Sequence, residues 1–270
     1  MRSPVTILLF GLACTAGLFA QDSATTRVGP EGFSGSAHFG LPMPFTGSMV
    51  VSGAPYSAEE VYESVRTLAD GTHITQQRQS TKTYRDSLGR TRTERPLFHA
   101  ALTARHQENS SPTLVEITDP VAQVKYTLDP INKVAHRQAL PAPPPPRRGA
   151  VKAALPRAGA AEELNPKRTS ENLGTRTIEG VEAQGSRTTT IWPVDSQGND
   201  RPFSVTNEQW FSSELKQNVL NISNDPRSGE QTQKLIDVSR AEPAANLFQP
   251  PPDYTVVDEK GDFTIKWEGQ

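Results

Sequence analysis

The sequence predicts a mainly β protein, built from antiparallel meanders and hairpins, with little helix after residue 20. Extended runs rich in Thr, Val, Ile and Tyr recur along the chain, and turns that contain Gly, Asp or Pro separate them. Only 34% of the residues are hydrophobic, so we expect a thin core, disordered segments, or both. A half-barrel is one arrangement that such a sheet can take.

Residues 1–20 have the three parts of a secretory signal peptide. Arg2 supplies the basic start, Val5 to Phe19 supply the apolar stretch, and a cleavage site ends at Ala20. The apolar stretch is too short to favour a permanent transmembrane helix. The alternative is a lipoprotein signal that would acylate Cys14. We therefore expect an exported protein, periplasmic or extracellular, that is not an integral membrane protein after cleavage.

Cys14 is the single cysteine, so none would remain in the mature chain to form a disulfide, a thiolate nucleophile or a zinc site. The formal net charge of −2 gives no reason to expect nucleic acid as a partner. The motifs of phosphate-binding loops, zinc proteases and serine hydrolases are missing from the sequence. We expect no catalytic residue, no metal and no cofactor.

Residues 21–54 are rich in Gly, Ser and Thr, and their hydrophobic residues show no repeat typical of a strand or a helix. This composition predicts a flexible N-terminal arm. Residues 55–139 predict a first antiparallel β block. Within it, Asp70-Gly71 lies between two extended runs and predicts a hairpin with a type I′ turn. The run Asp86-Ser87-Leu88-Gly89 predicts a type I turn in which Gly89 is left-handed.

Two further strands of this block end in an Asp-Pro pair, at Asp119-Pro120 and Asp129-Pro130. Proline presets φ for the first corner of a turn, and the aspartate caps that turn. Residues 140–172 differ in composition: a run of prolines is followed by Ala, Gly and basic residues without a period. This composition predicts a Pro-rich basic linker or long loop, with contact to an anionic polymer or a Pro-binding partner as the alternative.

Residues 173–270 predict a second antiparallel block, either continuous with the first sheet or separate from it. Glu242 to Phe248 predict one helical turn, whose Leu247 and Phe248 would plug an end of the sheet. After it, Phe263, Ile265 and Trp267 alternate with polar residues and predict a terminal strand. An apolar edge strand of this kind pairs with another strand, in the same molecule or in a second one.

The segment DVSRAEPAANLFQPPPDYTVV, within Leu235 to Val257, resembles the closing segment of bacterial lipoprotein carriers of the LolA-like type. The string YRDSLGRTRTE at Tyr84 to Glu94 is similar to one found in uncharacterised exported bacterial proteins. The carrier resemblance implies a half-barrel around a lipid cavity with a helix over its mouth.

These observations support an exported cell-envelope or extracellular binding or scaffold protein without catalytic chemistry. The alternative is a periplasmic lipid or lipoprotein carrier, and a second alternative is an unrecognised hydrolase. The partner would be an envelope protein, a polymer or a lipid. If the chain binds an apolar ligand, the candidate residues are Trp192, Trp210, Leu220 and Leu235. A contiguous apolar cavity against them would favour the carrier, and a filled core there would count against it.

Overall fold

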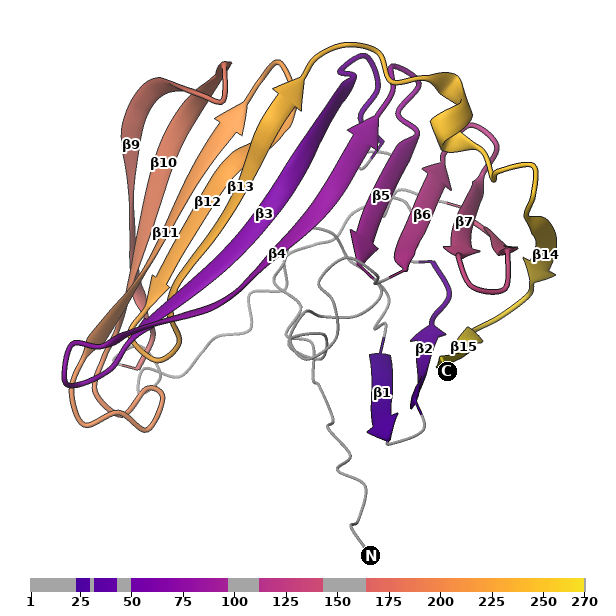
Figure 1. Ribbon diagram of the computed structural model, residues 1–270. Coiled ribbons are helices and arrows are strands. Elements are labelled where there is room, and N and C mark those ends of the chain that lie inside the picture. The colour runs from indigo at the N-terminus through magenta and orange to yellow at the C-terminus, as the bar shows by residue number, and fades with distance from the viewer. Residues whose placement is uncertain (1–22, 30–31, 43–49, 97–111, 143–163, 270) are drawn as a thin grey trace, which may run out of the picture.

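The computed structural model describes residues 23–29, 32–42, 50–96, 112–142 and 164–269, which form two β-sheets (Figure 1). The small sheet contains β1 (Ser23–Gly29), β2 (Gly32–Phe39) and β15 (Phe263–Gly269). The first strands of the large sheet are β3 (Tyr56–Thr67), β4 (His73–Arg85), β5 (Thr91–Pro96), β6 (Thr113–Asp119), β7 (Val124–Asp129) and β8 (Val134–Ala139). The later ones are β9 (Lys167–Ile178), β10 (Val181–Trp192), β11 (Phe203–Ser212), β12 (Gln217–Asp225), β13 (Gly229–Ser239) and β14 (Thr255–Glu259). A single 3₁₀ turn in the described part of the chain, η1 (Ala245–Phe248), precedes β14.

The large sheet has twelve strands in the order β14-β8-β7-β6-β5-β4-β3-β13-β12-β11-β10-β9. Strand β13 pairs with β3, so strands from both predicted blocks belong to one continuous sheet. Among the described strands every pairing is antiparallel except that of β14 with β8. The sheet is open, with β9 at one edge and β14 at the other (Figure 1). The predicted mainly β fold is confirmed.

Strands β6 to β8 are covered on both faces. Val115, Leu128 and Ala135 are cross-strand neighbours and share one face. They pack with Ile117 and with Phe248 of η1, which is 2% exposed. Phe248 therefore closes this end of the sheet, as the helical turn predicted from the sequence requires.

The small sheet packs on the opposite face of these strands (Figure 1). Its buried side chains form a cluster with Leu114 of β6; they are Ala37, Phe39, Phe263, Ile265 and Trp267. The Phe263 ring stacks on His136 with their centroids 4.4 Å apart. The predicted terminal strand is thus β15, with its apolar face buried, and it finds its partner β2 within the same chain.

Two boundary predictions are wrong. Residues 21–54 are not simply a flexible arm, because Ser23–Gly29 and Gly32–Phe39 are strands, and β2 is held by pairing with β15. The predicted end of the linker, at residue 172, lies too far along the chain, because β9 already begins at Lys167. Nearly all side chains of β9 are exposed, as expected for an edge strand, and this makes its composition look like that of a linker.

The turn at Asp70-Gly71 is not type I′, because positive φ occurs at Gly71 (+86°) and not at Asp70. The Gly71 N–H donates to the Leu68 carbonyl at 2.9 Å, which makes a type I turn followed by a left-handed glycine. The Asp70 carboxylate accepts the Thr72 N–H at 2.9 Å and supports this form. The same turn was predicted correctly at Asp86 to Gly89, where φ of Gly89 is +84°.

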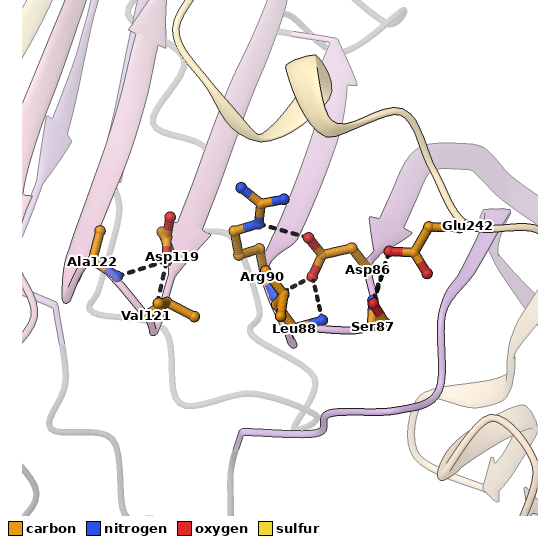
Figure 2. Close-up of polar contacts among 8 residues, drawn as sticks. All are labelled: Asp86, Ser87, Leu88, Arg90, Asp119, Val121, Ala122 and Glu242. Carbon is orange, nitrogen blue, oxygen red and sulfur yellow. Dashed lines mark hydrogen bonds and ion pairs between the residues drawn. The ribbon is translucent and has the colours of Figure 1, made fainter.

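Both Asp-Pro turns have the predicted cap. The Asp119 carboxylate accepts the N–H groups of Val121 and Ala122, each at 2.8 Å (Figure 2). The Asp129 carboxylate accepts those of Ile131 and Asn132 at 2.9 and 3.1 Å. Each carboxylate therefore satisfies two turn amides that the strands leave unpaired.

Within the described ranges there is no helix with the length and apolar character needed to cross a membrane. The predicted signal peptide, Cys14 and most of the Pro-rich segment lie outside the described residues.

Candidate functional site

The structure brings three of the four candidate ligand residues into one buried group, which we call the apolar cluster. Its members are Tyr56, Ala58, Val181, Ala183, Trp210, Leu215, Val219, Leu220 and Leu235. Trp210, Leu220 and Leu235 are only 5%, 8% and 4% exposed. Trp192 is not a member of the cluster. It lies at the end of β10 and stacks on Phe203 with a centroid separation of 6.3 Å.

Neighbouring strands hold the Trp210 ring closely. Gly185 is its cross-strand partner, and a Cβ atom at Gly185 would lie 2.6 Å from the ring, so only glycine fits there. The Arg176 guanidinium lies 3.9 Å from the ring centroid, and the indole Nε1–H donates to Glu208 at 2.7 Å. Protein atoms therefore fill the space around this ring.

Ion pairs surround this tryptophan. Arg187 donates to Glu171 and to Glu208, each at 2.8 Å. Burial opposes ionisation of Glu208, but the hydrogen bonds from Trp210 and Arg187 outweigh it and hold the pKa of Glu208 below its ordinary value. The sequence shows no spacing that could reveal this group, because its members come from three different strands.

The opposite face of β9 to β12 carries two rows of uncharged polar side chains, and we call these rows the polar face. Cross-strand pairing aligns its residues in two rows. One row is Asn172, Ser186, Gln209 and Asn221, and the other is Ser170, Thr188, Asn207 and Ser223. Because successive residues of a strand point to opposite faces, Gln209 and Trp210 lie on opposite sides of the sheet.

A shallow hollow of about 420 Å³ lies at the β9 end of the polar face. It is lined by Ser170, Glu171, Asn172, Gln184, Gly185, Ser186 and Phe211. Phe211 is 46% exposed there. Within the part of the chain that the structure describes, the side chains of Gln184, Ser186 and Gln209 make no hydrogen bond to protein, so they are free to meet solvent or a ligand.

The YRDSLGRTRTE string has a structural role at the turn between β4 and β5 (Figure 2). The Asp86 side chain is 2% exposed, and its carboxylate accepts the N–H groups of Leu88 and Arg90 at 3.0 and 2.8 Å. Arg90 Nε also donates to it at 2.6 Å. Ser87 donates from its N–H and its hydroxyl to Glu242, at 3.0 and 3.1 Å, and so ties the segment after β13 to this turn.

The arginines of this string anchor other segments. Arg85 donates to the carbonyls of Ala54 (2.9 Å) and Leu215, so it joins the β11–β12 turn to the centre of the sheet. Arg90 lies 5.0 Å from the centroid of the Phe248 ring. Arg92 donates to the Leu247 carbonyl at 2.9 Å, which fixes η1 against β5.

A buried carboxylate on β6 lies between two cations. Glu116 is 2.6 Å from the Lys125 ammonium and 3.5 Å from Arg95, and its side chain is 11% exposed. Burial alone would raise the pKa of Glu116, but the two positive charges and their hydrogen bonds outweigh it, so this pKa lies below its ordinary value. Stability from this group is complete above the unfolded-state pKa of about 4.3 and is lost as pH falls through the lower folded-state pKa.

We therefore expect Glu116→Gln to lower the free energy of unfolding at pH 7 by roughly 1–3 kcal/mol. We also expect it to flatten the loss of stability below about pH 5. Urea unfolding followed at several pH values measures both effects. Glu214→Gln is the control, because Glu214 pairs with Arg240 while both side chains are about half exposed. If the free energy of unfolding of Glu116→Gln fell below about pH 5 as steeply as that of the unchanged protein, the role given to this carboxylate would be contradicted.

The described histidines lie in separate places with different partners. His38 is 3.7 Å from Asp262, His136 is 2.7 Å from Glu259, and His73 is 3.0 Å from the Thr67 hydroxyl. Among the residues in the described ranges, no three His, Cys, Asp or Glu side chains gather as metal ligands. His99 and His106 lie outside those ranges.

The chain matches no protein-family model and no curated protein. Solved structures with a partial likeness include an uncharacterised conserved protein from Thermus thermophilus, with 10% identity, 78% of this chain and 93% of that chain covered, and a TM-score of 0.37. LprF from Mycobacterium bovis has 13% identity over 80% of this chain and 100% of that chain, with a TM-score of 0.31.

A protein domain assigned to outer membrane lipoprotein sorting, from Vibrio parahaemolyticus, has 7% identity over 74% of this chain and 92% of that chain, with a TM-score of 0.26. The weak LolA-like resemblance predicted from the C-terminal segment has a counterpart in this last structure, and these three likenesses all have TM-scores below 0.4.

Proposed function

We propose that this chain is an exported binding protein of the cell envelope, without catalytic chemistry, that presents one face of its open sheet to a partner. The observation that supports this most is the polar face, whose rows of uncharged side chains cross four strands and have a hollow at their β9 end. The apolar cluster packs the sheet on which this face is built. An envelope protein or a polymer would be the partner of the binding protein, a lipid would be the partner of the carrier considered next, and nucleic acid would be neither.

A lipid or lipoprotein carrier is the second candidate, and one observation favours it. Leu173, Ile178, Ile222 and Val238 pack against the apolar cluster while remaining partly exposed, so they offer apolar surface to an acyl chain. Arg176 lies beside them over Trp210, where its cation could meet a lipid phosphate.

Native mass spectrometry of the protein purified from its own host separates the two candidates. A co-purifying protein or polymer, recovered without lipid, is the result expected for the binding protein. Bound lipid supports the carrier, and in that case Arg176→Gln should retain at least fivefold less of it than the unchanged protein. Arg201→Gln is the control, because the Arg201 side chain is 87% exposed in a hairpin loop. A bare monomer, obtained even after cross-linking in living cells, would contradict both candidates.

A further inference from the structure

We propose that the hollow on the polar face is a binding site for a neutral, hydroxyl-rich polysaccharide. The inference rests on the proposed function and adds the chemical class of the partner. It depends on the hydrogen-bonding groups of the hollow, its lack of net charge, its exposed aromatic ring, and the repeat of polar groups across the strands.

The free groups of the hollow match sugar hydroxyls. Gln184 lines the hollow, and Gln209 lies beside it as the cross-strand neighbour of Ser186. Each of these two amides offers a carbonyl acceptor and an NH₂ donor, and the Ser186 hydroxyl offers both roles. A sugar hydroxyl also donates and accepts, so it can pair with either kind of group. These three side chains are exposed and, among the described residues, have no protein partner that a ligand would have to displace.

The hollow has no charge to offer an ionic ligand. Glu171 is the one charged residue among the described residues that line it, and its carboxylate is already paired with Arg187 at 2.8 Å. The remaining lining side chains are uncharged. An anionic polymer would gain no ion pair here and would be repelled by Glu171, whereas a neutral polymer would not.

Phe211 supplies an apolar surface of the kind that a sugar ring can cover. The residue is 46% exposed, and its cross-strand neighbour on the same face is Gln184. The face of an aromatic ring carries negative charge density and attracts the C–H groups of a sugar ring. The side chains beside it can then bond to the hydroxyls at the edge of that sugar.

The rows of the polar face favour a polymer over a single sugar. Adjacent strands lie about 4.8 Å apart, so a chain that crosses β9 to β12 meets a new polar side chain at each strand. The hollow lies beside the free edge strand β9, so the polymer can continue past the sheet (Figure 1). A short oligosaccharide should therefore bind more tightly as its length increases.

Isothermal titration calorimetry of the full chain tests this site, with cellohexaose and the hexamer of N-acetylglucosamine as neutral probes. We expect at least one of them to bind, and to bind at least tenfold more tightly than its dimer. We expect the variant Gln184→Ala/Ser186→Ala/Phe211→Ala to lose at least tenfold in affinity. Because no ion pair is involved, raising the salt from about 0.05 to about 0.5 M should change the affinity less than twofold.

Gln249→Ala and Val256→Ala are the controls, because both residues are exposed far from β9, and Val256 is exposed to the same 46% as Phe211. Both should bind as the unchanged chain does. The inference is overturned if neither hexamer binds, if the triple variant binds normally, or if only an anionic polymer or lipid vesicles bind. If both sugars fail while a protein partner co-purifies from the host, the polysaccharide inference falls and the proposed function stands.

Discussion

Phe248→Ala should lower the free energy of unfolding by about 3–5 kcal/mol, a large share of the roughly 5–15 kcal/mol typical of a folded domain. Phe248 is 2% exposed and packs against Val115, Ile117, Leu128 and Ala135, which come from three strands. Removal of the ring leaves a cavity that these strands cannot fill, because their own pairing holds them in place. Thermal unfolding followed by circular dichroism should show a midpoint lower by roughly 10 °C.

The control for this variant is Leu88→Ala, which removes an apolar side chain that is 54% exposed. Its midpoint should stay close to that of the unchanged protein. A shift of less than about 2 °C in Phe248→Ala would mean that η1 does not close this end of the sheet.

Asp86→Ala should lower the free energy of unfolding by about 2–4 kcal/mol, because it removes one carboxylate that accepts hydrogen bonds from three donors. The loss leaves the Leu88 and Arg90 amides without their acceptor. It also leaves the guanidinium of Arg90, whose side chain is 16% exposed, without its counter-charge. Chemical denaturation with guanidinium chloride measures the change. Asp86→Asn should recover part of the stability, since an amide oxygen still accepts from the backbone.

Asp70→Ala is the matched control, because Asp70 caps a turn of the same type but lies on the surface. It should leave the denaturation midpoint almost unchanged. If the two variants were equally destabilised, burial would not be what makes the Asp86 turn important.

Local features of the fold were predictable from the sequence, and distant pairings were not. The turn at Asp86 to Gly89 and the alternation of Phe263, Ile265 and Trp267 depend on a few adjacent residues, and both predictions are confirmed. The strand Gly32–Phe39 was missed because its partner lies far along the chain: His38 and Thr264, which bond to each other, are 226 residues apart. Composition cannot show a pairing at that distance.

For the candidate site, too, some features were predictable from the sequence and others were not. Hydrophobic character was enough to suggest Trp210, Leu220 and Leu235, which do gather in one cluster. Trp192 lies outside this cluster, because it stands at the far end of β10, where it stacks on Phe203. The rows of the polar face were not predictable, because each depends on the register of several strands at once.

The final strands of the chain have a consequence for the time at which the protein can fold. A chain emerges from the ribosome with its N-terminus first, yet Gly32–Phe39 pairs with Phe263–Gly269 and β8 pairs with β14. Both sheets therefore stay incomplete until β14 and β15 have been made, and contacts of such long range form slowly. Closure of both sheets is therefore expected to be a late step in the folding of this chain.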